Sequence, residues 1–343
     1  MHGGIPVVVV LGVLAGSTLL SGAAFADAAD FSEQTKSDLA AAMAPLAAEG
    51  SGAAGARARD PGVGGPRCWF GLEPRAADPF DGFARPVTNL QFHHPFIWNE
   101  IRPVFVQHWF PKDSLLAGGD LRAYACQIHA KITDDLQFTA YKDGYVHFDS
   151  KALPDDTGFA DLAAGFKYKL WQNLEVPAIF TVGLGYETTT GDEEVLEGGH
   201  GDLFDLFGSY ARKMGDVNLI TTAGFILPMD SDEATRAFHW HVHFDIPATA
   251  NFSPLLEFNL FHYMSNAENN AGLGPTVPLG FEGFDYTNLG SDDVDGNTVA
   301  SMALGFRWAL SDDVSFGAAY EWPMTDREDV IDKRFTADLV FRF

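Results

Sequence analysis

The sequence predicts an all-β fold, a transmembrane antiparallel up-and-down β-barrel of about 12 strands. Segments after residue 100 alternate apolar and polar residues, and the connections between them alternate long and short. The last strand has a continuous apolar face, formed by Phe335, Ala337, Leu339, Phe341 and Phe343. Its opposite face carries Thr336, Asp338 and Arg342. A strand of this kind fits a wall that has lipid on one side and a watery lumen on the other.

The composition agrees with one large all-β domain. The chain has 343 residues with 35 glycines and 29 phenylalanines, a profile expected when apolar and polar faces alternate and aromatics gather at membrane interfaces. The formal net charge of −25 argues against a nucleic acid as partner, because phosphate binding needs clustered Lys and Arg. A soluble β-sandwich or propeller is the main rival fold, and it explains the alternation but not the unequal loops.

The region before the first strand divides into three parts. Residues 1–26 predict a signal peptide, with an apolar run and an Ala24-Phe25-Ala26 cleavage site, although the first residues lack Lys and Arg. A retained membrane anchor is the alternative. Residues 27–66 are a low-complexity Ala/Gly-rich arm, interpreted as a periplasmic tether and less favourably as a lumen plug. Residues 67–99 are a lead-in segment rich in proline and aromatics, and residues 100–343 form the barrel.

Period-two alternation places the strands. In one example, Phe238, Trp240, Val242 and Phe244 alternate with His239, His241, His243 and Asp245. We expect strands near residues 100–109, 120–132, 136–147, 159–170, 177–188, 203–212, 217–227, 237–247, 254–264, 298–309, 314–323 and 333–343.

The connections predict the orientation of the barrel. The long ones are residues 110–119, 149–158, 189–202, 228–236, 265–297 and 324–332. The short ones are residues 133–135, 171–176, 213–216, 248–253 and 311–313. Membrane barrels have long external loops and short periplasmic turns, so the N-terminal arm and the C-terminus are both expected in the periplasm.

Two features resemble known outer-membrane proteins. Residues 158–170, GFADLAAGFKYKL, are similar to a strand of barrels in the MetA-pathway (phenol degradation) family and related transporter-like barrels. The final strand, with Phe341 and Phe343, resembles the C-terminal signal of Gram-negative outer-membrane barrels. The resemblance implies the outer membrane of a diderm bacterium, contact with its lipid, recognition by the barrel-assembly machinery and passage of small solutes, hydrophobic ones included. It carries over no catalytic residues.

Alternation also predicts which polar side chains line the lumen. Inside a narrow barrel, charges must pair or stay wet, so these residues form a cross-lumen network, a field that sorts solutes, or both. Two histidines of one strand could share a metal with Glu257 or Asn259, but a polar wall is the favoured interpretation, and neither a metal site nor a cofactor is expected. The predicted lumen-lining residues are Lys167, Lys169, His239, His241, His243, Asp245, Glu257, Asn259, Arg307 and Glu321.

Other candidates are weaker. The acidic loops at residues 191–194 and 291–297 offer oxygen ligands but lack the full EF-hand spacing, so solvated loops are favoured over calcium sites. His262 and Ser265 lie close in sequence, yet on a strand a serine three residues away points to the opposite face, which argues against a lipid hydrolase. Cys126 alternates with apolar residues and is interpreted as lipid-facing.

The predicted function is non-enzymatic: passive or facilitated passage of a small solute. A barrel of about 12 strands has a small lumen filled largely by side chains, which argues against a general porin. The first alternative is a structural or surface-interaction barrel that acts through its long external loops. A lipid hydrolase is the less favoured second alternative.

Overall fold

The computed structural model describes residues 78–274 and 276–343. The predicted signal peptide at residues 1–26, the arm at residues 27–66 and the first part of the lead-in, including Cys68, lie outside the described residues. Over the described ranges, no helix has both the length and the apolar character needed to cross a membrane.

The described chain is built from strands and one short 3-10 helix, η1 (Glu193–Val195). The strands are β1 (Glu100–Trp109), β2 (Gly119–Lys131), β3 (Leu136–Lys142), β4 (Tyr145–Ser150), β5 (Asp156–Phe159), β6 (Leu162–Asn173), β7 (Ala178–Thr188), β8 (Leu203–Met214), β9 (Val217–Pro228), β10 (Ala237–Asp245), β11 (Phe252–Tyr263), β12 (Thr298–Ala309), β13 (Val314–Pro323) and β14 (Lys333–Arg342).

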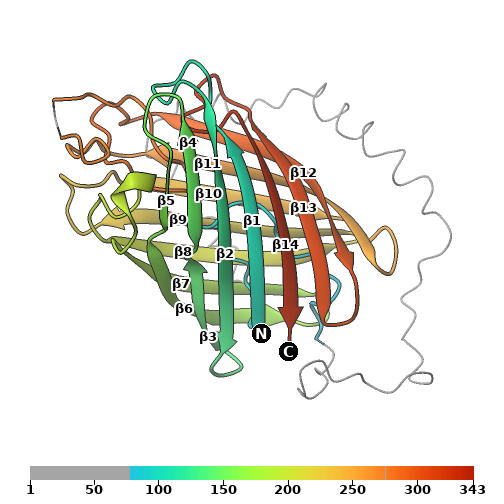
Figure 1. Ribbon diagram of the computed structural model, residues 1–343. Coiled ribbons are helices and arrows are strands. Elements are labelled where there is room, and N and C mark those ends of the chain that lie inside the picture. Colours follow the sequence, from blue (N-terminus) through green and yellow to red (C-terminus); the bar gives the residue numbers. More distant parts are fainter. Residues whose placement is uncertain (1–77, 275) are drawn as a thin grey trace. The chain divides into compact units, whose positions relative to one another are not determined.

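These strands close into an antiparallel barrel (Figure 1). Each strand pairs with its neighbours, and β1 pairs with both β14 and β2, which removes the open edges of the sheet. The segments β3 and β4 occupy one position in the wall, as do β5 and β6, so the barrel has twelve strand positions. The predicted fold class is therefore confirmed.

The wall is interrupted between β3 and β4. There the carboxylate of Asp143 accepts a hydrogen bond from the backbone nitrogen of Cys126 at 2.7 Å, where a regular ladder bond would otherwise form. Gly144 has a φ of +128°, and a Cβ at this position would lie 2.6 Å from the carbonyl oxygen of Tyr124. Just before this break, the pairing of β3 with β6 shifts by one residue between Ala140 and Lys142, so Tyr141 and Lys142 are both buried although they are adjacent in sequence. The regular alternation predicted for residues 136–147 is broken at this point.

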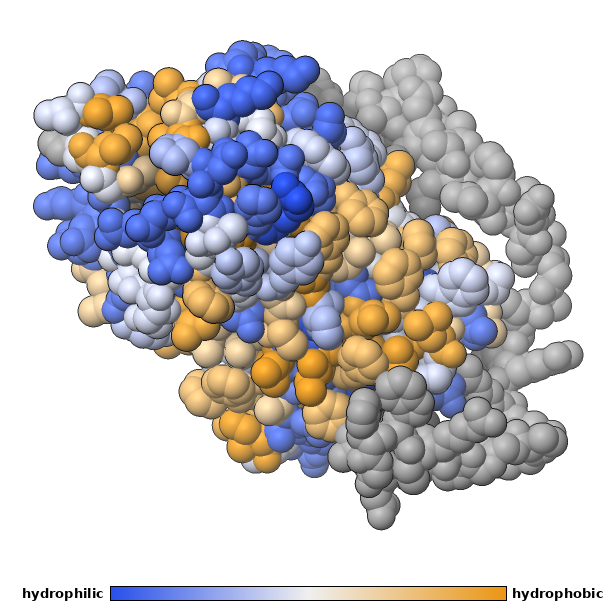
Figure 2. Space-filling view, in the orientation of Figure 1, coloured by the Kyte–Doolittle hydropathy of each residue, from blue (hydrophilic) through white to orange (hydrophobic). Residues whose placement is uncertain are grey.

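The outer face is apolar. Phe166, Leu184 and Leu206 lie side by side on β6, β7 and β8, and they are 53%, 49% and 50% exposed. Figure 2 shows apolar residues gathered over the strands, whereas polar residues gather over the end that carries the long loops. An apolar belt above a polar rim is the surface expected of a barrel that sits in lipid.

Long and short connections lie at opposite ends of the barrel, as predicted (Figure 1). At the long-loop end, the loops at residues 189–202 and 264–297 fold over the mouth. Their Val195, Phe284 and Val294 are buried in an apolar cluster with Phe148 and Phe261 of the wall. The mouth is thus covered by packed side chains.

Residues 78–99, the lumen segment, run inside the ring of strands (Figure 1, blue). Inward side chains from many strands contact this segment, among them Gln137 of β3, Thr222 of β9 and Arg307 of β12. Near the short turns, Phe80, Phe83, Phe96 and Trp98 of the segment pack together and against Ile179, Ala211 and Ile220 of the wall. The expectation of a lead-in at residues 67–99 did not include this position inside the lumen.

Candidate functional site in the lumen

The lumen wall binds the backbone of the lumen segment through charged side chains. The Glu257 carboxylate accepts hydrogen bonds from the backbone nitrogens of Val87 and Thr88, both at 2.8 Å. Arg307 donates from Nε to the carbonyl oxygen of Arg85 at 2.9 Å. Hydrogen bonds to a charged group are about twice as strong as neutral ones, so these contacts fix the position of the segment.

A second set of contacts holds the following residues of the segment. The carbonyl oxygen of His93 accepts hydrogen bonds from Thr222 at 2.6 Å and from Ser209. The ammonium of Lys167 donates to the carbonyl oxygen of His94 at 2.5 Å. These donors come from β6, β8 and β9, so the segment is bound on several sides.

The histidines of β10 form a continuous polar chain. His239 lies 3.0 Å from Asp205 through Nε2 and 3.0 Å from His241 through Nδ1. Asp205 also contacts His93 of the lumen segment at 2.9 Å, and His241 contacts Asn259 at 2.9 Å. All these side chains are buried. The imidazoles thus bond to carboxylates, to an amide and to each other.

His243 belongs to the same face but has carboxylate partners on two sides. Its Nδ1 lies 2.8 Å from Glu257 and its Nε2 lies 3.2 Å from Asp245. The amide nitrogen of Asn259, the partner of His241, donates to the Glu321 carboxylate at 2.8 Å and to the hydroxyl of Thr88 at 3.0 Å. The His-rich face is therefore part of one network with the lumen segment.

Most of the residues predicted to line the lumen are buried inside the barrel. Lys169 differs, because its ammonium lies at the rim near the short turn, 2.9 Å from the Asp135 carboxylate. The buried ones are Lys167, His239, His241, His243, Asp245, Glu257, Asn259, Arg307 and Glu321.

Asp338, on the face of the last strand that alternation assigns to the lumen, lies between Arg307 at 2.8 Å and Arg102 at 2.6 Å. Other buried polar residues were not predicted, among them Asp205 and Arg85, and Arg85 of the lumen segment pairs with Glu100. Asp205 was missed because apolar residues fall on both faces of its strand in the sequence. Arg85 was missed because the region around it has no periodicity, so its position in the lumen left no pattern to detect.

The loop at residues 264–297 reaches the lumen segment from the long-loop end. Asp285 accepts a hydrogen bond from the backbone nitrogen of Leu90 at 3.2 Å and pairs with Arg334 at 2.7 Å. Glu282 accepts hydrogen bonds from the hydroxyl of Thr235 and from three backbone nitrogens. Burial nevertheless raises the pKa of Glu282. The loop is therefore anchored internally as well as to the segment.

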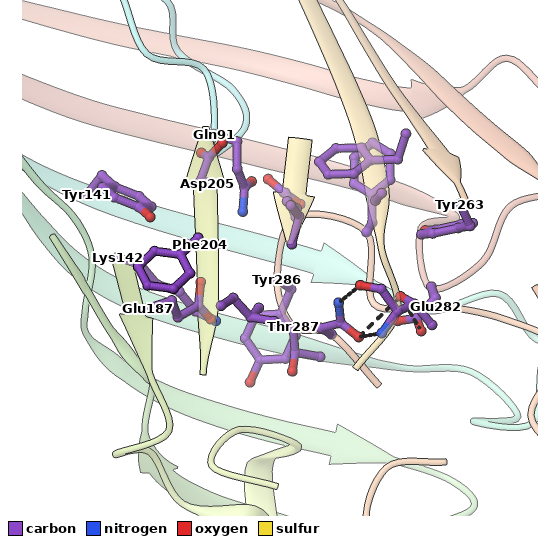
Figure 3. Close-up of a pocket in the computed structure, with 18 residues that line it drawn as sticks. Gln91, Tyr141, Lys142, Glu187, Phe204, Asp205, Tyr263, Glu282, Tyr286 and Thr287 are labelled. Carbon is purple, nitrogen blue, oxygen red and sulfur yellow. Dashed lines mark hydrogen bonds and ion pairs between the residues drawn. The ribbon is translucent and has the colours of Figure 1, made fainter. Parts of the chain in front are cut away.

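Small cavities lie between the loops, the lumen segment and the wall. One of about 20 Å³ lies among Tyr141, Glu187 and Tyr286 (Figure 3). Another, of about 50 Å³, is lined mainly by apolar side chains such as Val104 and Leu121. A cavity needs at least about 10–15 Å³ to hold one water, so each has room for only a few.

The weaker candidates from the sequence were the pair His262 and Ser265 and the acidic loops. His262 lies 2.9 Å from the hydroxyl of Thr298, whereas the hydroxyl of Ser265 accepts a hydrogen bond from the backbone nitrogen of Arg236. These contacts give the serine no histidine as a base. Calcium binding by the acidic loops stays a prediction.

Comparisons with known proteins relate this geometry to a fold. No family model and no curated protein matches the sequence. An outer membrane channel from Pseudomonas putida F1 is similar in structure, with 14% identity, a TM-score of 0.52 and coverage of 78% of this chain and 100% of that one. The NanC porin covers 71% of this chain and 100% of its own at 6% identity, with a TM-score of 0.45. The likeness to the Pseudomonas channel shows that the fold is that of an outer-membrane β-barrel.

Proposed function

We propose that this protein is an outer-membrane barrel that passes a small solute, and that the lumen segment controls the route. The observation that carries this proposal is how the segment is held. Residues 84–94 are bound to the wall mainly through polar contacts, such as those from Glu257 and Arg307. When such a hydrogen bond is replaced by hydrogen bonds to water, the net cost in free energy is about 0.5–1.5 kcal/mol, or about 1.5–3 kcal/mol when one partner is charged.

This mode of attachment suits a movable plug. When the segment leaves, the wall residues that bound it are polar and accept water in its place. An apolar lumen filled by apolar packing would instead favour a permanently closed barrel. The aromatic cluster of Phe80, Phe83, Phe96 and Trp98 gives the segment fixed ends, between which residues 84–94 can move.

The proposal places the protein in the outer membrane of a diderm bacterium. The apolar outer face supports this location, as do the MetA-pathway-like segment at residues 158–170 and the terminal strand. By the loop rule, the arm at residues 27–66 and the C-terminus are periplasmic after removal of the signal peptide. Phe341 and Phe343 would serve the assembly machinery, and the role needs no catalytic residue.

Single-channel conductance in planar bilayers tests the proposal. Three folded proteins are compared: the full chain, a deletion of residues 27–66 and a deletion of residues 27–98. We expect frequent, larger steps in the longer deletion, and equal conductance in the other two, because the lumen segment rather than the arm blocks the lumen. A longer deletion that folds but stays silent would overturn the proposal.

A surface-interaction role is the second candidate. The loop at residues 264–297 exposes the apolar side chains of Leu273 and Val277 beyond the barrel wall. Exposed apolar residues on a loop can bind another protein. This role requires no conductance, so a silent barrel whose long deletion is also silent would favour it.

A further inference from the structure

A cluster of metal-ligand side chains lies at the long-loop end, away from the histidines of β10. It consists of Asp161 between β5 and β6, Glu187 on β7, and Glu197 and His200 in the loop at residues 189–202. Each residue offers one ligand atom, and these atoms lie within 4.8 Å of one another. The Nε2 atom of His200 is 3.0 Å from Asp161 and 3.9 Å from Glu187.

The charge of this cluster favours a cation. Three carboxylates face one ammonium, that of Lys142, which lies 2.6 Å from Glu187 and 2.8 Å from Glu197. Buried charges of one sign are costly unless they are compensated. Asp161 lies beside these two carboxylates, so the carboxylates of the cluster outnumber the ammonium that contacts them.

One atom of the cluster, Oε1 of Glu197, has no hydrogen-bond partner, although Glu197 is 0% exposed. Buried polar atoms are normally satisfied, so an orphaned one calls for an explanation. A carboxylate oxygen is of a type that binds metals directly.

The surroundings orient the ligands. Asp161 accepts hydrogen bonds through Oδ1 from the backbone nitrogens of Gly191 at 2.8 Å and Gly198 at 3.2 Å. Such contacts fix a carboxylate in the way that metal ligands are usually supported. Lys142 and Glu187 also line the cavity of about 20 Å³ drawn in Figure 3, which gives an approach to the cluster.

A second cluster, His94, Glu100 and His129, also gathers ligand atoms but is electrostatically different. Arg85 is hydrogen-bonded to Glu100, and the ammonium of Lys167 binds the carbonyl oxygen of His94. Two cations beside a single carboxylate repel a divalent ion. This difference in charge favours the cluster at the long-loop end as the cation site.

We propose that Asp161, Glu187, Glu197 and His200 bind a divalent transition metal of the Zn²⁺ class. An imidazole with carboxylates suits zinc, whereas calcium takes about six to eight oxygen ligands. The ion would tie the loop at residues 189–202 to the end of β5 beside the interruption of the wall. Lys142 competes for two of the same oxygens and thereby sets the affinity.

Zinc titration of the folded, chelator-treated full-length chain tests this site, with calorimetry for affinity and elemental analysis for stoichiometry. We expect one ion per chain, with affinity reduced about tenfold or more by Glu197→Gln and by His200→Ala. Glu194→Gln is the matched control, because Glu194 lies in the same loop but is exposed. Wild-type protein that binds no zinc, or equal binding by all four proteins, would overturn the proposal.

A fourth variant distinguishes the loss of a metal ligand from a loss of folding. Lys142→Met removes the competing ammonium, so it should raise zinc affinity about tenfold, whereas a structural defect would lower it. Cobalt provides a second readout, because its visible spectrum should differ between the wild type and His200→Ala if the imidazole is a ligand. Unchanged affinity in Lys142→Met together with an unchanged cobalt spectrum in His200→Ala would contradict the assignment.

Discussion

The carboxylate of Glu257 lies 2.8 Å from the backbone nitrogen of Thr88, which joins strand β11 to the lumen segment across 169 residues of sequence. The same carboxylate contacts His243 at 2.8 Å. Glu257 is therefore shared between the wall and the segment, and it couples the position of the segment to the charge of the lumen.

Glu257→Gln should weaken the hold on the lumen segment. The amide keeps an acceptor but loses the negative charge that strengthens both backbone hydrogen bonds, a loss of about 1–2 kcal/mol. We expect channel openings to become more frequent in bilayer recordings, with an unchanged step size. Glu175→Gln, at an exposed turn, is the control. Equal opening frequency in the two variants would show that Glu257 does not hold the segment.

Leu184→Arg should destabilise the barrel in lipid. Leu184 faces outward in the middle of β7, and an arginine at the bilayer midplane costs about 2–4 kcal/mol. Denaturant unfolding in lipid vesicles measures this change. Leu174→Arg, in the short turn after β6, should cost far less because that side chain reaches water. A similar cost at both positions would place the apolar belt elsewhere.

Stability of the loop at residues 324–332 should depend on pH through Asp329. Burial raises the pKa of Asp329 from 3.8 to about 6, although Arg327 beside it opposes the shift. The folded state therefore holds its proton more tightly than the unfolded state, and stability falls as the pH rises through this window.

Asp329→Asn should remove this contribution. The melting temperature in detergent should drop less between about pH 4 and about pH 7 in the variant than in the wild type. The amide can still accept the hydrogen bond that the Tyr263 hydroxyl donates at 2.8 Å. The same pH dependence in both proteins would exclude Asp329 as its source.

Phe343→Ala should reduce assembly rather than the stability of the finished barrel. Phe343 is partly exposed, and its backbone nitrogen donates to the carbonyl oxygen of Asn99 at 3.2 Å, a contact that alanine keeps. We expect less heat-modifiable protein in the outer membrane of expressing cells. Phe159→Ala, at another exposed aromatic residue, is the control. Equal yields would argue against an assembly signal.

The strands and their faces could be predicted because successive side chains of a strand in a barrel wall point alternately outward and inward. His239 and Glu257 were assigned to the interior on this basis, and the structure buries both. The interruption at Gly144 was not predicted: the inward residues are odd-numbered before it, as at Gln137 and Thr139, and even-numbered after it, as at Val146 and Phe148.

The site itself was harder to predict than its wall. The lumen segment has no periodicity, since its backbone is bound by side chains from all around the barrel rather than by a neighbouring strand. The cluster of Asp161, Glu187, Glu197 and His200 is assembled from separate segments, so no spacing in the sequence indicates it.

A reversible covalent lock on the lumen segment tests whether this segment controls the route through the barrel. The hydroxyl of Thr88 lies 3.0 Å from the amide nitrogen of Asn259, so cysteines at the two positions point toward each other and a short, reducible bis-methanethiosulfonate reagent can bridge them. With Cys68 and Cys126 replaced by serine, the bridged Thr88→Cys, Asn259→Cys protein should be silent in bilayers, and reduction should restore discrete conductance steps. Equal conductance before and after reduction, or silence in both states, would contradict a route controlled by this segment.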